Sequence, residues 1–470
     1  MSTKANNKMA GQDADAKNHY TGSLRVPYHC ISIDAKLTDT LAAMRQCIYP
    51  SGDRQQLIES LKKQWTTPHN RSHVLPCLCV RTAFDLYLRV MKYPPGSEII
   101  MSGVNIPDMG KIIRHHAIRI VSIDINIDTL SPKVELLESL ISERTVAVLV
   151  AHVYGKWFEM DDVIEIAHRH GLHVLEDCAE AFRGSSHCGH PDADLSFFSF
   201  GVIKTSTAFG GAIVKIKDLK LYQSMVDMYK TYPIRPNSEY FKKVLKYAIL
   251  IFIMNASEWR TALSTNILRF FEFDYKKLFV DMLRGFPKDF FVKIRHQPST
   301  PLLYMMYKRI SRFKESSMNE SRQKGDYVTQ RLPSSVGVVG SNASIKNYWL
   351  FPVLVENPEE VCKELNDVGV DAVTGPTSLQ VVEPCNGSDS MEQLSDLITH
   401  YPEEAKFLID HVMYLPVHKN VTYHQLDRLV LALELVLKKL AHKKFTQPSF
   451  EAKQLFVDDT QVKIPLKSKL

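Results

Sequence analysis

The feature that most constrains the fold of this chain is a regular alternation of short apolar runs and amphipathic segments between residues 97 and 181. Strands separated by helices of about 10 to 15 residues are typical of βαβ crossovers and a mostly parallel sheet. These runs are apolar throughout, as expected when helices cover both faces of the sheet. The predicted strands are 97–103, 118–125, 145–155 and 172–181, and the predicted helices are 108–117, 134–142 and 160–171. We therefore expect an α/β fold with a mostly parallel central sheet.

The rest of the sequence indicates how the 470 residues are divided. A strand-like run (348–356), a helix ending at a glycine (358–370) and a long helix with a basic end (423–444) indicate a small C-terminal α+β domain. The predicted units are a disordered lead 1–24, a large α/β domain 25–234, a basic and aromatic-rich helical insertion 235–314, the C-terminal domain 315–445 and a tail 446–470.

Charge and cysteine content exclude some classes of protein. The net charge of +6 is too small by itself to indicate a nucleic-acid-binding protein. The eight cysteines are scattered through a long chain, which does not resemble a disulfide framework and fits a reducing compartment. Cys77 and Cys79 lack the two-residue spacing of a zinc knuckle. We therefore predict no metal site and a cytoplasmic location. The alternative is a protein attached to the cytoplasmic face of a membrane.

Charged residues stand where two buried strands are predicted to end. Glu176 and Asp177 stand at the end of the strand 172–176, and Lys204 follows the run 195–203. Ligands of a parallel α/β sheet bind at the carboxyl ends of its strands, and a buried carboxylate there needs a cation or a donor. An acid that keeps a pyridine nitrogen protonated and a lysine that forms a Schiff base suit pyridoxal phosphate, with Ser199 near the phosphate. An Asp and a Lys 27 residues apart are also commonplace, so spacing alone leaves a purely structural role open.

Longer motifs carry a resemblance to a known family. They are VRTAFDLYL (80–88), PPGSEIIMSG (94–103), the run 145–177, EDCAEA (176–181), ADLSFFSFGVIK (193–204), the glycine pair 210–211 and HVMYLPVH (411–418). In this order they resemble the DegT/DnrJ family of pyridoxal-phosphate-dependent sugar aminotransferases of fold type I. The resemblance is strong over 75–218 and weaker over the last 170 residues. It implies a homodimer, an amino acid donor and a keto-sugar acceptor carried on a nucleotide or a lipid.

The resemblance also implies a role for each matching residue. Lys204 would carry the Schiff base and then shuttle protons, and Asp177 would pair with the pyridinium. Ser199, Thr82 and Ala83 would hold the phosphate. A phosphate at a helix N-terminus is physically reasonable, because free amides and the helix dipole both favour an anion there.

Two further residues fall in register with the family motifs. Asp194 is expected to be structural and to tie loops together near the site. His152 lies at a predicted strand end, where it either faces the cofactor or is a core histidine with its hydrogen bonds satisfied.

Several positions depart from the family pattern. Glu180, counted among the cofactor-binding residues, stands where the family has a glutamine beside the ring hydroxyl, and a carboxylate there would alter the proton balance. Arg81 replaces a glycine and either adds charge to the phosphate pocket or points outward. Asn105 and Ile106 stand near the position of the family's ring-stacking aromatic. The family's N-x-R segment has no clear equivalent, and the nearest stretch is 295–299.

The segment 235–314 holds 16 Lys and Arg against 6 Asp and Glu. Its longest apolar run, 247–254, is too short for the about 20 residues that cross a bilayer. Apolar and aromatic residues mixed with cations fit helices in a membrane interface, helices packed on the main domain, or a single-stranded nucleic-acid site. We expect packing for 244–254, peripheral membrane contact for 270–314 and no nucleic-acid partner.

The leading hypothesis is a pyridoxal-phosphate-dependent aminotransferase that transfers an amino group from an amino acid to a keto-sugar. The second hypothesis keeps the cofactor but makes the reaction an elimination or dehydration; Lys204 argues against it, because family dehydratases are expected to carry histidine there. The third is a catalytically degraded, membrane-associated scaffold, motivated by Arg81, Glu180 and the missing aromatic.

Overall fold

The computed structural model describes residues 24–65, 73–185, 187–254, 289–375, 377–383 and 401–448. Residues 1–23 of the expected lead, 255–288 of the expected insertion and 449–470 of the expected tail lie outside this part of the chain.

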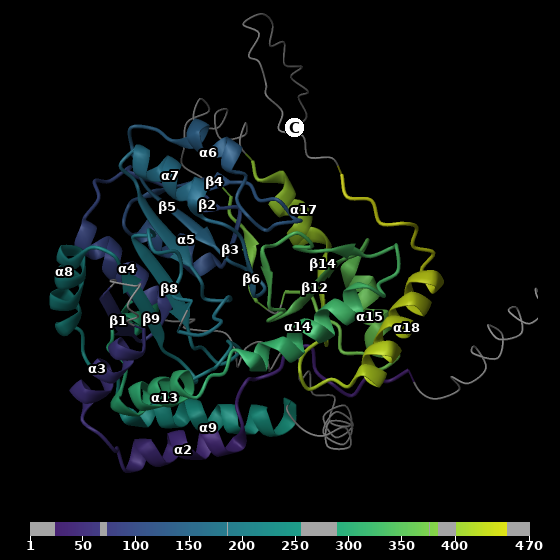
Figure 1. Ribbon diagram of the computed structural model, residues 1–470, viewed down its shortest axis with the longest axis horizontal. Coiled ribbons are helices and arrows are strands. Elements are labelled where there is room, and N and C mark those ends of the chain that lie inside the picture. The colour runs from purple at the N-terminus through teal and green to yellow at the C-terminus, as the bar shows by residue number, and fades with distance from the viewer. Residues whose placement is uncertain are drawn as a thin grey trace, which may run out of the picture.

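A seven-stranded sheet forms the centre of the larger part of the molecule (Figure 1). Its order is β1-β9-β8-β7-β5-β2-β4. The strands are β1 His73–Cys77, β2 Glu98–Ser102, β4 Arg119–Ile123, β5 Thr145–Ala151, β7 His173–Asp177, β8 Leu195–Ser199 and β9 Ala212–Ile216. Neighbouring strands from β4 to β8 are parallel, and β9 is antiparallel to both β8 and β1. The prediction of a mostly parallel sheet is confirmed.

Helices cover both faces of this sheet, which explains why its strands are apolar on both sides. One face packs against α4 Val80–Met91, α5 Pro107–His115 and α8 Leu219–Lys230. The other packs against α6 Val134–Leu140, α7 Asp161–Arg169, α2 Leu37–Ile48, α3 Arg54–Trp65, α9 Asn237–Met254 and α13 Thr300–Ser311. The three predicted crossover helices correspond to α5, α6 and α7, each within a few residues of its predicted bounds.

The C-terminal part of the chain builds a smaller layer beside the sheet (Figure 1). A three-stranded antiparallel sheet, in the order β10-β12-β14, packs against helices around a separate core. Its elements are α14 Ser316–Thr329, β10 Gly337–Val338, β12 Phe351–Leu354, α15 Pro358–Asp367, α17 Glu403–His411, β14 Val412–Leu415 and α18 Tyr423–Lys439. The predicted strand and both predicted helices of this region are present.

Two short strand pairs join the C-terminal part to the central sheet. β6 Lys156–Trp157 pairs with β11 Ile345–Lys346, and β3 Val104–Asn105 pairs with β13 Gln380–Val381. Because β6 and β3 directly follow the carboxyl ends of β5 and β2, these pairs bring distant segments to the edge where the site lies.

The described part of the basic segment consists of α9, α12 Phe290–Ile294 and α13. α9 buries Val244, Tyr247, Leu250 and Ile251 in the core, so the packing predicted for 244–254 is confirmed for that face of the helix. α13 buries most of its apolar side chains in the same core, so these side chains are not exposed for membrane contact; the membrane contact predicted for 270–314 stays a prediction. Within the described residues, no helix combines the length and apolar character needed to span a bilayer.

The second glycine of the pair after Lys204 packs closely against α13. Gly211 has φ +89°, and a Cβ there would lie 2.9 Å from Met306 Cγ and closer still to its sulfur. We expect Gly211→Ala to cost about 2–4 kcal/mol, from a strained positive φ and overpacking together, measured by denaturant unfolding. Gly171→Ala is the control, because Gly171 has φ +69° with nothing near its Cβ position, so only the smaller backbone cost applies. Equal losses in the two variants would contradict the packing argument.

Candidate active site

A cavity opens at the carboxyl ends of β5, β7 and β8, where the strand register brings Ala151, Asp177 and Phe197 alongside one another. Four predicted site residues line it: Asp177, Glu180, Ser199 and Lys204. They come from the last residue of β7, the turn after it, the last residue of β8 and the loop after β8. Parallel topology therefore places at one edge residues that are up to 27 positions apart in the chain.

Lys204 lies on the cavity wall with two close neighbours. Its Nζ donates to Glu180 Oε1 at 3.1 Å and lies 4.0 Å from the centre of the Trp349 ring. Glu180 is held in turn by the backbone N–H of Tyr154, which donates to Oε2 at 3.0 Å. The carboxylate that replaces the family's glutamine is thus the direct partner of the lysine.

Asp177 is a buried carboxylate beside Lys204. Burial raises its pKa from 3.8 to about 6, while the Ala179 N–H, which donates to Oδ1 at 3.0 Å, and the charge of Lys204 oppose that rise. A carboxylate that is buried away from water is stabilised in its ionised form by a cationic group of a ligand. A protonated pyridine nitrogen is a group of that kind.

The structure does not bring Thr82 and Ala83 into the cavity lining. The Thr82 hydroxyl donates to the Ile294 carbonyl at 2.7 Å, and the amides of both residues bond to the Cys79 carbonyl inside α4. Their predicted contacts to a phosphate therefore do not appear in this arrangement. The preceding residues of α4, Val80 and Arg81, line the cavity instead.

Arg81 is an ion-pair partner of Asp108, with Nη1 and Oδ2 2.5 Å apart. Asp108 lies in the first turn of α5, so this pair links the starts of two helices at the cavity. The sequence is compatible both with an Arg81 that adds charge to the pocket and with one that points outward. The structure places it on the cavity wall with its charge already compensated by Asp108.

Two residues that the sequence did not single out reach the site from the C-terminal part. Trp349 covers Lys204, and its Nε1 donates to the Ile203 carbonyl at 2.7 Å. Leu379, just before β13, lines the same cavity. No local signal could identify them, because they approach Lys204 only through the β6–β11 and β3–β13 pairs.

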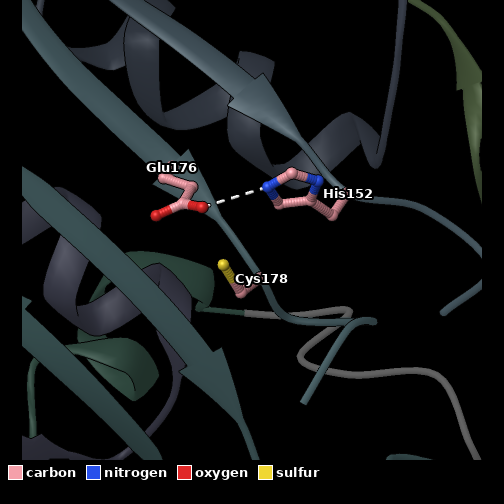
Figure 2. A group of neighbouring side chains, drawn as sticks. All are labelled: His152, Glu176 and Cys178. Carbon is pink, nitrogen blue, oxygen red and sulfur yellow. Dashed lines mark hydrogen bonds and ion pairs between the residues drawn. The ribbon is translucent and has the colours of Figure 1, made fainter. Parts of the chain in front are cut away.

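His152, Glu176 and Cys178 form a fully buried group beside the cavity, and His152 is part of the cavity lining (Figure 2). Their ligand-type atoms lie within 4.8 Å of one another, and His152 Nε2 is 3.0 Å from Glu176 Oε1. The other Glu176 oxygen accepts from the Ser196 hydroxyl and the His190 N–H, both at 2.8 Å. Despite the cost of burial, the hydrogen bond and charge of His152, the charge of Lys215 and the Ser196 hydroxyl lower the pKa of Glu176 to about 2. We interpret the group as structural, since its carboxylate already accepts hydrogen bonds at both oxygens.

Asp194 joins elements beneath the site. Its Oδ2 accepts from the Val174 N–H at 2.8 Å and lies 3.1 Å from His168 Nε2. These contacts tie the start of β8 to β7 and α7, in agreement with the structural role expected for it.

Besides the buried carboxylate of Asp177, a second observation supports the fit of the cavity to pyridoxal phosphate. Asn105 Nδ2 is buried and has no hydrogen-bond partner within the described residues, although Asn105 lines the cavity. A buried donor of this kind is costly unless a ligand or water accepts from it. The lining therefore offers a carboxylate, an amine, a hydroxyl and an amide donor to a polar ligand.

Comparison with known sequences gives a family match. Residues 33–264 match the sequence model of the DegT/DnrJ/EryC1/StrS aminotransferase family. GDP-perosamine synthase of Caulobacter vibrioides is 31% identical over 156 residues, which are 33% of this chain and 42% of that protein. L-glutamine:2-deoxy-scyllo-inosose aminotransferase of Streptomyces fradiae is 32% identical over 156 residues, 33% of this chain and 37% of that protein. The alignments thus span less than half the length of these relatives.

Solved structures agree over a longer stretch. The aminotransferase TlmJ of Streptoalloteichus hindustanus matches with a TM-score of 0.59 and 16% identity, over 87% of this chain and 100% of that chain. An Escherichia coli GDP-4-keto-6-deoxy-D-mannose-3-dehydratase with bound hydrated pyridoxal phosphate matches with a TM-score of 0.59 and 13% identity, over the same shares. These matches confirm the type I fold predicted for the chain. Residues 33–264, just under half of the chain, thus resemble the DegT/DnrJ/EryC1/StrS aminotransferase family.

Proposed function

We propose that the protein is a pyridoxal-phosphate-dependent aminotransferase that moves an amino group from an amino acid to a keto-sugar. The observation that carries the proposal is the shared cavity of Lys204 and Asp177 at the carboxyl edge of the sheet. The cofactor, when bound, supplies an electron sink that makes the amino carbon acidic. The names of the matched relatives support a sugar acceptor.

Five residues at the cavity have a proposed part in this function. Lys204 holds the cofactor covalently through Nζ and then moves a proton at the amino carbon. Asp177 holds a proton on the pyridine nitrogen, and Ser199 binds the phosphate with the N-terminal amides of α4. Glu180 orients the Lys204 amine, and Trp349 keeps water from it. We also propose the homodimer that the family resemblance implies.

The test is incubation of the purified full chain with pyridoxal phosphate, followed by borohydride trapping and mass spectrometry. We expect one cofactor per chain, attached to Lys204. Transfer from glutamate or glutamine to a keto-sugar nucleotide should then produce an amino sugar without loss of water. A dehydrated product would favour the lyase hypothesis, and failure to attach the cofactor would leave the scaffold hypothesis.

Glu180→Gln tests whether the carboxylate restrains the lysine. It removes the charge of the group that accepts the hydrogen bond from Lys204 Nζ, so the amine is held less tightly and reaches an incoming aldehyde more readily. We expect cofactor attachment about 5–10-fold faster, the equivalent of about 1 kcal/mol for one charged hydrogen bond. Glu364→Gln removes a different carboxylate, paired with Lys439 on the far domain, and should leave the rate unchanged. A slower or unchanged rate in Glu180→Gln would contradict this role.

A further inference from the structure

A second cavity, of about 700 Å³, lies on the far side of the loop that carries Lys204. Ser206, two residues after Lys204, forms part of its wall, and its N–H donates to Asp34. The rest of the wall comes from the chain before α2 and the start of α2, the ends of α9 and α13, the start of α14 and the loop 418–420. None of its lining residues belongs to the cavity described above.

The lining of this second cavity is strongly basic. It holds five cations, Lys36, Arg309, Arg312, Lys314 and Lys419, and one carboxylate, Asp34. Arg309 and Lys419 are compensated by Asp34 and Asp39. Lys36, Arg312 and Lys314 are in no ion pair with any residue that the structure describes. Burial lowers the pKa of His418 to about 4, so this histidine adds no charge at neutral pH.

An exposed apolar edge adjoins the cavity. Of the twelve large apolar side chains that are exposed in the described residues, seven are on or beside two helices that run side by side at the bottom of Figure 1. They are Leu37, Leu41, Ile48 and Tyr49 on or just after α2, and Leu245, Ile249 and Phe252 on α9. Leu37 and Phe252 also line the cavity, so the apolar edge and the basic cavity form one continuous surface.

We propose that this surface docks on a bilayer of anionic phospholipid, with a phosphorylated headgroup in the cavity and the apolar edge in the interface. Exposed apolar patches rimmed by charge mark protein or membrane contact sites. A second copy is the weaker occupant, because a two-fold interface would set the cations of one copy against the same cations of the other. An anionic lipid surface complements them, as in interfacial amphipathic helices.

The proposal is independent of the chemistry assigned to Lys204. Co-sedimentation of the full chain with vesicles of phosphatidylcholine and phosphatidylserine should pellet it, whereas vesicles of phosphatidylcholine alone or high salt should not. Lys204→Ala should pellet like the wild type. A wild-type protein that binds vesicles but shows no amino transfer would therefore count only against the proposed function.

Two variants test the surface, each with a matched control. The triple change Lys36→Glu, Arg312→Glu and Lys314→Glu should lower the vesicle partition coefficient ~100-fold or more, because each replaced cation loses its attraction to the anionic lipid surface. Its control reverses three exposed cations elsewhere, Lys363, Lys443 and Lys444. The double change Leu41→Ser and Ile249→Ser should lower it ~10-fold or more, against Leu219→Ser and Leu435→Ser as the control.

Three outcomes would overturn the proposal. The wild type and the triple variant could pellet equally with anionic vesicles. Pyrophosphate could bind in calorimetry while no vesicle binds, which would assign the cavity to a soluble phosphate ligand. The apolar double variant could convert a dimer to a monomer with unchanged vesicle binding, which would assign the edge to a second copy.

Discussion

Replacement of Lys204 by alanine should abolish amino transfer while the protein stays folded. Loss of proton transfer alone typically costs about 10²–10⁴-fold, and loss of the covalent anchor adds to it. The side chain is only partly buried and its ion-pair partner keeps the Tyr154 amide, so the fold tolerates its removal. The measurements are turnover, borohydride trapping and thermal melting of the variant.

Lys204→Arg separates charge from nucleophilicity. Arginine can keep the pair with Glu180 but cannot form the covalent link, so we expect a folded, inactive protein that takes up the cofactor reversibly. Lys217→Ala is the control, because Lys217 is a surface lysine paired with Asp192 and should leave turnover unchanged. Activity of Lys204→Ala within tenfold of the wild type would assign the chemistry to another residue.

Replacement of Asp177 by asparagine should weaken cofactor binding and stabilise the cofactor-free protein at the same time. Removing one partner of a buried charge pair typically costs about 3–5 kcal/mol, so affinity should fall by roughly 10²–10³-fold or more. In the cofactor-free protein, however, the buried carboxylate is itself unfavourable, which is why its pKa is raised to about 6.

The sign of the stability effect follows from that pKa. The protonated acid contributes stability below pH 3.8, and the contribution is lost as pH rises through about 6. A shift of about two pKa units corresponds to about 3 kcal/mol, so cofactor-free Asp177→Asn should be more stable than the wild type by up to that amount at pH 7 and equally stable below pH 4. Denaturant unfolding at several pH values measures it.

Asp194→Asn is the control for both effects. It lies at the start of β8, where its carboxylate bonds to the Val174 amide and to His168. Its replacement should lower the free energy of unfolding. The affinity of the folded protein for the cofactor should stay unchanged. An Asp177→Asn variant that binds the cofactor normally would show that the carboxylate does not face the pyridine nitrogen.

Predictions from local pattern were accurate where the pattern was strong. The strand ending at Asp177 and the helices α5, α6 and α7 follow from apolar periodicity, because burial on two faces or on one stripe leaves a direct trace in the sequence. The gathering of Asp177, Glu180, Ser199 and Lys204 follows from parallel topology, since carboxyl ends of neighbouring strands meet at one edge.

Other features depend on contacts between distant segments. The phosphate contacts expected of Thr82 and Ala83 depend on how α4 begins, and its first turn meets Ile294, more than 200 residues later in the chain. The basic segment has a composition compatible with both core and membrane. Only packing shows that α13 lies in the core while α9 exposes Leu245 and Ile249.

The sequence by itself predicted the α/β class, the family resemblance and a site built on Lys204 and Asp177, because each prediction depends on local periodicity or on a contiguous motif. The tertiary structure alone decided that Glu180 pairs with Lys204, that Trp349 covers it, and that a basic cavity adjoins an apolar edge of α2 and α9. The physical reason is that these features come from side chains brought together by strand pairing and helix packing, and no local stretch of sequence contains both partners.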